Sequence, residues 1–198
     1  MQKLLPFILI GFAFFLNSCH SKKNNVEDSK NDSSELASIF PVTDFLKGQL
    51  RMIDSMQTTP LKLIISNGKT DSMWLKREDI RTDATTFLQP VIDSITMSPL
   101  FSEKSFLDQT INAFTFSYDP KVRLPDSLHL THWDVYINPQ SREVQRIYLV
   151  KETNESNNHI ITQLTWATDG WYSIRTITQS PGKNEPDVKE EKMIWSFD

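Results

Sequence analysis

The chain has 198 residues, of which 21 are lysine or arginine and 25 are aspartate or glutamate, so its formal net charge is −4. A mildly acidic chain whose basic residues are scattered among acids is poorly suited to binding nucleic acid, because affinity for phosphate backbones comes from clustered basic side chains. Its single cysteine excludes an internal disulfide, so the folded part must be stabilised by a packed core.

The first 18 residues are typical of a signal peptide. Lys3 supplies a positive start, and an almost wholly apolar run over residues 4–16 ends in a polar step. The run is about 13 residues long, whereas a membrane-spanning helix needs about 20. Residues 16–19, Leu-Asn-Ser-Cys, resemble the lipobox of the bacterial lipoprotein class, in which a dedicated peptidase cuts before the cysteine. This resemblance, which covers about 20 residues, implies acyl chains on Cys19 and therefore a membrane as a partner.

Residues 19–36 are interpreted as a flexible tether. Between residues 20 and 35 nearly every side chain is Ser, Lys, Asn, Asp or Glu, which leaves too little apolar surface to order the segment. Such a segment typically spans roughly 20 to 25 Å. In the lipoprotein class an aspartate after the cysteine tends to retain a protein in the inner membrane, and here that residue is His20. The resemblance therefore implies the outer membrane of the bacterial cell envelope, and we expect the periplasmic face.

The first half of a single domain, residues 37–198, combines helices with a hairpin. Pro41 opens a helix whose apolar side chains recur at helical spacing as far as residue 56. Asn67-Gly68 predicts a tight turn between two strands, residues 61–66 and residues 72–76. Further on, the sequence predicts a second helix from Glu78 to Leu88, a kink or end at Pro90, and one more helical turn over residues 91–95.

From residue 113 onward the apolar period changes to two, which is typical of half-buried strands. Across one predicted hairpin we expect Trp133 to pack against Tyr148. The predicted strands are residues 113–118, 132–137, 144–151, 160–167 and 171–178, and a last strand through Met193, Trp195 and Phe197. The sequence therefore predicts an α+β domain, an antiparallel and curved meander of about eight strands with two or three N-terminal helices packed on it.

The sequence lacks the signatures of the common catalytic classes. No glycine-rich loop is present to cradle a phosphate, and no serine lies in a Gly-x-Ser-x-Gly elbow. His132 and Asp134 point to one face of a strand, but His129 points to the other, so these residues do not converge on one metal ion. We therefore interpret these residues as polar positions on the surface of the domain. We expect no catalytic residue, no metal site and no cofactor.

Three aromatic residues and four serines are candidates for binding and for modification. Trp166, Trp171 and Tyr172 flank the predicted Asp169-Gly170 turn, where their rings either stack on a ligand or belong to the core. Four Asp-Ser-apolar triplets resemble the sites that some bacteria O-glycosylate on exported proteins, although Asp-Ser also suits helix caps. The candidate serines are Ser55, Ser72, Ser94 and Ser127.

These observations favour a membrane-anchored envelope lipoprotein whose domain is a non-enzymatic binding or assembly module for an envelope protein or a small ligand. The alternative is a carrier that holds a lipid or another apolar molecule in a half-barrel cleft. A hydrolase of envelope polymers is the third hypothesis. An apolar cavity of roughly 300 Å³ or more on the sheet would favour the carrier. A packed sheet face would favour the binding module, and a cleft with convergent carboxylates would favour the enzyme.

Overall fold

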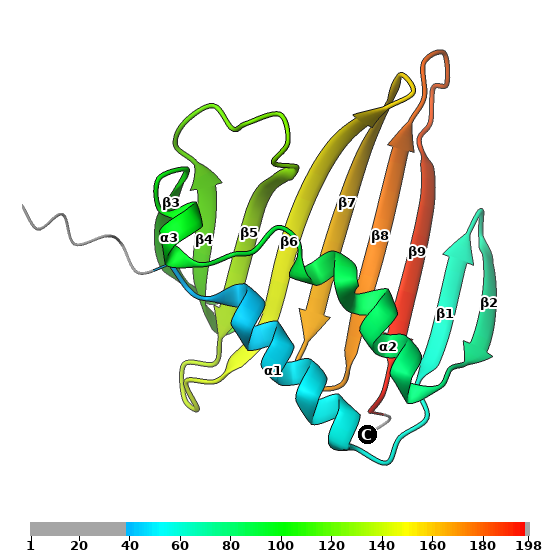
Figure 1. The fold of residues 1–198 in the computed structure, drawn as a ribbon, viewed down its shortest axis with the longest axis horizontal. Coiled ribbons are helices and arrows are strands. Elements are labelled where there is room, and N and C mark those ends of the chain that lie inside the picture. Colours follow the sequence, from blue (N-terminus) through cyan, green and yellow to red (C-terminus); the bar gives the residue numbers. More distant parts are fainter. Residues whose placement is uncertain (1–38, 197–198) are drawn as a thin grey trace, which may run out of the picture. The chain divides into compact units, whose positions relative to one another are not determined.

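In the computed structural model, which describes residues 39–196, nine strands form one antiparallel sheet (Figure 1). The strand order is β2-β1-β9-β8-β7-β6-β5-β4-β3, so a continuous meander runs from β3 to β9 and the β1–β2 hairpin joins it beside β9. The strands are β1 Leu61–Ser66, β2 Lys69–Trp74, β3 Phe101–Asp108, β4 Ala113–Pro120, β5 Leu130–Ile137, β6 Val144–Glu155, β7 Asn158–Ala167, β8 Trp171–Gln179 and β9 Asp187–Ile194. The predicted signal peptide, the tether with Cys19, and Phe197 lie outside the described residues.

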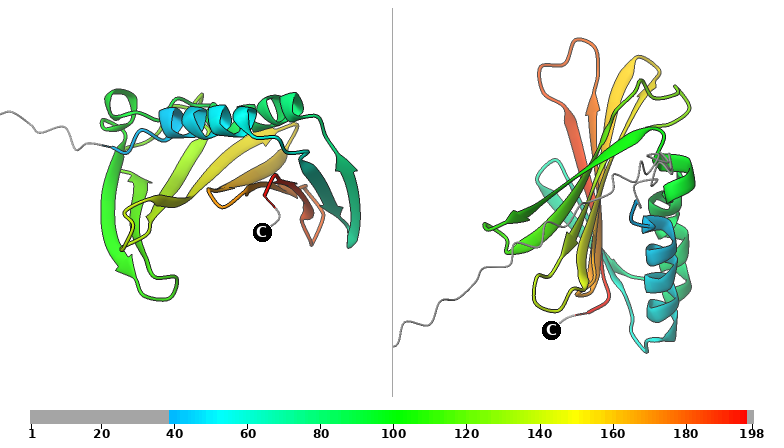
Figure 2. Two further views of the ribbon diagram at one scale, coloured as in Figure 1. Left: turned by 90° about the horizontal axis from the view of Figure 1, so that it is seen from below. Right: turned by 90° about the vertical axis from the view of Figure 1, so that its left-hand side faces the viewer.

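All helices of the described region lie on one face of the sheet (Figure 2). They are α1 Val42–Ser55, α2 Arg77–Asp83, the 3₁₀ helix η1 Ala84–Leu88, and α3 Ser94–Met97. The segment from α2 to α3 carries the chain from β2 at one edge of the sheet to β3 at the other. One sheet face is thus covered by helices, and we call the opposite one the uncovered face.

Helix α1 forms where the sequence predicts it and buries one apolar face. Its buried side chains recur every three or four residues, as a helix packed on a sheet requires: Val42, Thr43, Leu46, Leu50 and Ile53. The one polar member, Thr43, accepts a hydrogen bond from the backbone N–H of Ile92 at 2.8 Å. This bond fastens α1 to the segment that leads into α3.

The core lies between the helices and the covered face. Trp133 on β5 and Trp166 on β7 are completely buried there. Phe87 of η1 packs edge-on against Trp166 and Tyr172, with ring centroids 5.5 and 5.2 Å apart. Edge-on aromatic pairs add roughly 0.5 to 1.5 kcal/mol beyond the area they bury. The aromatic side chains predicted on the sheet therefore hold the helices in place.

The predicted α+β class and the antiparallel sheet are confirmed, but the sheet has nine strands in the described region rather than about eight. The strand that the sequence did not predict is β3. It is an edge strand in which Phe101 is buried and most other side chains are exposed, so its residues show no apolar alternation. The two predicted hairpin turns, at Gly68 and Gly170, lie where the sequence places them.

One predicted contact is wrong. Trp133 pairs with Leu149 and lies on the covered face, whereas Tyr148 pairs with Asp134 and lies on the uncovered face. The β5–β6 register is shifted by one residue from the predicted one, and such a shift moves a side chain to the opposite face. Tyr148 therefore belongs to the surface of the sheet and not to its core.

Candidate functional site

The uncovered face carries aromatic and basic side chains among half-buried aliphatic ones such as Leu63, Ile161 and Ile177. Side chains alternate along each strand, so the neighbours of the buried residues of β5, β6 and β8 point to this face. Its half-buried rings are Tyr136, Tyr148 and Trp171. Three basic side chains on the same face, Arg146, Arg175 and Lys192, have no carboxylate partner within 4.0 Å among residues 39–196.

A pocket of about 270 Å³ lies at one end of this face. The residues that line it come from the β3–β4 turn, from β5 and β6, and from the β7–β8 turn: Ile111, Tyr136, Gln145, Arg146, Ala167, Thr168 and Asp169. A phenol, a guanidinium, a carboxylate and an amide thus line one small hollow together with aliphatic groups. Small ligand sites in proteins typically combine a few such polar groups with apolar walls.

The β7–β8 turn that forms one wall of the pocket is tied down on both sides. The Thr168 hydroxyl donates to the backbone carbonyls of Val144 at 3.0 Å and of Gln145 at 3.1 Å, and so joins the turn to the start of β6. Gly170 has φ +125°, a conformation that favours glycine, and its carbonyl accepts the N–H groups of Trp195 and Ser196. The wall is therefore held in one position by backbone contacts.

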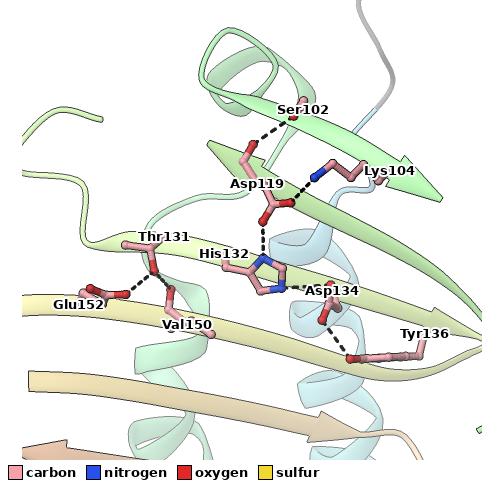
Figure 3. A network of polar contacts seen from close by, with 9 residues as sticks. All are labelled: Ser102, Lys104, Asp119, Thr131, His132, Asp134, Tyr136, Val150 and Glu152. Carbon is pink, nitrogen blue, oxygen red and sulfur yellow. Dashed lines mark hydrogen bonds and ion pairs between the residues drawn. The ribbon is translucent and has the colours of Figure 1, made fainter. Parts of the chain in front are cut away.

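A chain of polar contacts crosses the uncovered face and ends at the pocket residue Tyr136 (Figure 3). Lys104 Nζ lies 3.0 Å from Asp119 Oδ2, and Asp119 Oδ1 lies 2.9 Å from His132 Nδ1. His132 Nε2 lies 3.1 Å from Asp134 Oδ1, and the Tyr136 hydroxyl donates to Asp134 Oδ2 at 3.0 Å. The groups follow one another as cation, anion, imidazole, anion and phenol. The last contact, from the Tyr136 hydroxyl to Asp134, fixes the orientation of the Tyr136 ring.

The electrostatics of this polar chain favour positioning over proton transfer. The hydrogen bond to Asp134 raises the pKa of His132 against the opposing effect of burial, with Asp119 adding to the rise. Burial works to raise the pKa of Asp134, but contacts with His132, Ser117 and Tyr136 outweigh it and lower the pKa. Burial and the Asp134 charge raise the pKa of Tyr136, so its hydroxyl stays protonated. Both nitrogens of His132 face carboxylates, which favours the protonated ring and leaves neither nitrogen free to act as a base.

The three aromatic candidates from the sequence do not act together. Trp166 and Tyr172 stack on each other within the core, with ring centroids 5.3 Å apart, and their burial leaves no face for a ligand. Trp171 lies on the uncovered face, with Lys192 Nζ 4.3 Å and the Arg146 guanidinium carbon 5.8 Å from its ring centroid. Its role is therefore to hold two cations beside the pocket.

The histidines and acids considered as metal ligands are only partly brought together. His132 contacts Asp119 and Asp134, whereas His129 contributes its backbone carbonyl to a bond with the Glu152 N–H at 2.8 Å. Within residues 39–196, no group of three His, Cys, Asp or Glu side chains is arranged to hold a metal ion.

The four candidate serines for modification occupy different settings. Ser127 and Ser72 are exposed, the former in the turn between β4 and β5 and the latter on the edge strand β2. Ser55 is exposed at the end of α1, and its hydroxyl donates to the Met52 carbonyl at 2.6 Å. The Ser94 hydroxyl donates to the carbonyl of Ile39, and the preceding Asp93 caps α3, as the helix-cap interpretation of the triplet predicts. Ser127 is the best presented of the four, and its glycosylation stays a prediction.

Sequence reasoning did not predict the pocket residues Ile111, Arg146 and Asp169. They lie in three separate segments, and only the strand register places them around one hollow. The sequence does contain a local signal for Tyr136. This residue lies between Val135 and Ile137 on β5, so its side chain points to the face opposite theirs. The Asp169-Gly170 turn was identified, but as a hairpin connection and not as a pocket wall.

The fold and the pocket together define an α+β domain with one helix-covered sheet face, one uncovered face and a small polar pocket on the latter. Comparison of the chain with known proteins finds no matching family model, no similar curated protein and no similar solved structure. In the region from residue 39 to residue 196, no helix is long and apolar enough to cross a membrane.

Proposed function

We propose that this chain is a lipid-anchored protein of the bacterial cell envelope whose domain is a non-enzymatic binding module. The uncovered face is its binding surface, and the pocket beside Tyr136 and Arg146 receives a small polar ligand. The observation that carries the proposal is this pocket, because it combines charged and polar groups with a wall fixed by backbone hydrogen bonds. A preformed pocket of this kind loses little free energy to ordering when a ligand enters.

The polar chain behind Tyr136 supports binding in preference to acid or base catalysis. His132 is engaged at both nitrogens, and its contacts with Asp134 and Asp119 raise its pKa. A general base needs a free acceptor within reach of a substrate proton. The chain of contacts instead holds the Tyr136 ring still at the edge of the pocket.

The packed covered face weighs against the alternative of a lipid carrier. The space between the helices and the sheet is filled by the core, in which Trp133, Leu149 and Trp166 are fully buried. A carrier needs a continuous apolar cavity for acyl chains. The pocket beside Arg146 is smaller than such a cavity, and charged groups contribute to its lining, which suits a polar ligand.

The anchoring part of the proposal rests on the lipobox resemblance at Cys19 and on the polar tether of residues 19–36. Several acyl chains, at roughly 0.8 kcal/mol for each buried methylene, hold a protein on a bilayer durably. We place the anchor in the outer membrane with the domain on the periplasmic side. Cells that express the chain and are fed labelled palmitate should yield a labelled product, and Cys19→Ser should abolish both the label and membrane association. An unlabelled product would refute the anchor.

The binding part of the proposal is tested by hydrogen exchange on the full-length chain, with and without a low-mass extract of the bacterial periplasm. We expect slower exchange at residues 134–146 and 167–171, which surround the pocket. The variant Arg146→Gln should lose this protection, whereas Arg123→Gln, in the exposed turn between β4 and β5, should keep it. Protection confined to the helices, or none at all, would contradict the uncovered face as the binding surface.

A further inference from the structure

The charges that line the pocket have opposite signs but do not meet. Arg146 and Asp169 both line it, yet no ion pair within 4.0 Å joins either of them to any residue of the described region. Elsewhere in the domain, exposed side chains of opposite sign do pair, as Lys183 and Asp187 do at 2.6 Å. A separated guanidinium and carboxylate around one hollow fit a ligand that carries both an anionic and a cationic group.

The other lining groups restrict the ligand further. The pocket volume of about 270 Å³ lies below the range of about 300–1,000 Å³ that is usual for drug-sized ligands. Ile111 and Ala167 supply aliphatic contacts, and the Tyr136 hydroxyl, which donates its proton to Asp134, offers only acceptor lone pairs to the pocket. These features indicate a small zwitterion with a short apolar part.

The protein also holds the two walls in place before any ligand arrives. The Arg146 guanidinium is oriented by the Trp171 ring at 5.8 Å, and Asp169 sits in the turn that Thr168 fastens to β6. A plain anion in this pocket meets the carboxylate of Asp169, and a plain cation meets the guanidinium of Arg146. Only a ligand with both charges has an opposite partner on each wall.

We propose that the pocket binds a free α-amino acid with an apolar side chain. Its carboxylate pairs with the Arg146 guanidinium, its ammonium pairs with the Asp169 carboxylate, and its side chain contacts Ile111 and the Tyr136 ring. This inference rests on the proposed binding function and names the class of ligand for the same pocket.

The test measures binding of alanine, leucine and phenylalanine to the full-length chain in detergent by titration calorimetry. N-acetyl-leucine lacks the ammonium and leucine amide lacks the carboxylate, so each should bind about tenfold to a hundredfold more weakly than leucine. Arg146→Gln should weaken leucine by a similar factor but should not weaken leucine amide, because that cation loses a like-charge repulsion. Asp169→Asn should weaken leucine but should not weaken the anion N-acetyl-leucine, for the same reason. The matched controls Arg123→Gln and Asp126→Asn lie in the exposed turn between β4 and β5, outside the pocket, and should not alter leucine binding.

Three outcomes overturn the inference. The first is that none of the three amino acids binds; the second is that leucine amide and N-acetyl-leucine bind as tightly as leucine. Tighter binding of the dipeptide alanyl-leucine, whose end charges lie further apart, would also overturn the assignment of a free amino acid. The exchange protection described above separates these results from a failure of the binding function, because it does not depend on the ligand being an amino acid.

Discussion

The two faces of this sheet contain the same kinds of residue and use them differently. On the covered face, Trp133, Trp166 and Tyr172 are buried under the helices. On the uncovered face, Trp171 and Tyr136 are half-buried and contact charged groups. Trp171 and Tyr172 are adjacent in the chain, so aromatic content alone does not reveal which ring belongs to the core. The side of the strand decides between packing and binding.

The largest expected difference between the faces comes from removing one tryptophan from each. Trp133→Ala should lower the free energy of unfolding by about 3 to 5 kcal/mol, because it empties a fully buried site. Trp171→Ala should lower the free energy of unfolding by only about 1 to 2 kcal/mol, since it removes a half-buried ring and its cation–π contacts. Urea unfolding followed by circular dichroism measures both values. Equal losses would mean that the uncovered face is not free in solution.

The assignment of residues to faces around β7 and β8 depends on the turn at Gly170. A Cβ at this position would lie 2.2 Å from Ser196 Cβ, and the φ of +125° is unfavourable for any other residue. Gly170→Ala should therefore destabilise the domain by about 3 kcal/mol and disturb the pocket wall at Asp169. Thermal unfolding provides the measurement.

Gly48 offers the matched control for that substitution. It lies inside α1 with no atom within 4 Å of an added Cβ and without a positive φ. Gly48→Ala should stabilise the chain by about 0.5 to 1 kcal/mol, because alanine loses less conformational entropy in a helix. If both substitutions shifted the melting temperature in the same direction, the turn would not have the special role assigned to it.

Local signals allowed much of the fold to be predicted from the sequence. The period of side chains in α1, the Asn67-Gly68 turn and the alternation in β5 each depend on residues close together in the chain. Such signals predict an element without knowledge of its neighbours. They are strongest where one face of the element is buried and the other is not, which describes α1 and the central strands.

What could not be predicted depends on long-range register. β3 carries too few buried side chains to show a pattern, and the β5–β6 register decides whether Tyr148 faces the core or the solvent. The pocket needs Ile111, Arg146 and Asp169 to meet across three connections. The spacing of these residues along the chain does not indicate that they lie close together, so only the assembled sheet reveals the site.

A third prediction applies one chemical change to both faces. The Tyr172 hydroxyl is buried and has no hydrogen-bond partner among residues 39–196, so Tyr172→Phe should raise the free energy of unfolding by about 1 kcal/mol. The Tyr136 hydroxyl donates to Asp134, and Tyr136→Phe should lower the free energy of unfolding by about 1.5 kcal/mol. Paired urea titrations test the difference in sign. A stability loss for Tyr172→Phe would point to a partner for its hydroxyl and would weaken the contrast between a dry and a polar face.

The smallest effect concerns the charges of the uncovered face and their dependence on pH. The pKa of His132 is raised from its ordinary value of 6.5, so its contribution to stability is complete below about pH 6.5 and is lost as the pH rises through the raised value. The pKa values of Asp119 and Asp134 are lowered from 3.8, so their contributions are present above that pH and are lost in more acid solution. The polar chain therefore stabilises the domain most between about pH 4 and pH 6.5.

The variant His132→Gln isolates this effect, because glutamine has a similar reach but no charge. The loss of unfolding free energy that it causes should be greater at pH 5.5 than at pH 9, and an NMR titration of wild-type His132 should give a midpoint above 6.5. The covered face has its own charged chain, in which Lys62 contacts Asp83 and Glu191. Trp133 packs instead against the rings of Phe101 and Tyr118, so Trp133→Ala should cost nearly the same at both pH values. A His132→Gln loss that grows towards pH 9 would mean that the imidazole is neutral in the folded protein. The Tyr136 ring would then be held by a chain with a neutral imidazole, and the charge-assisted positioning assigned to the uncovered face would be lost.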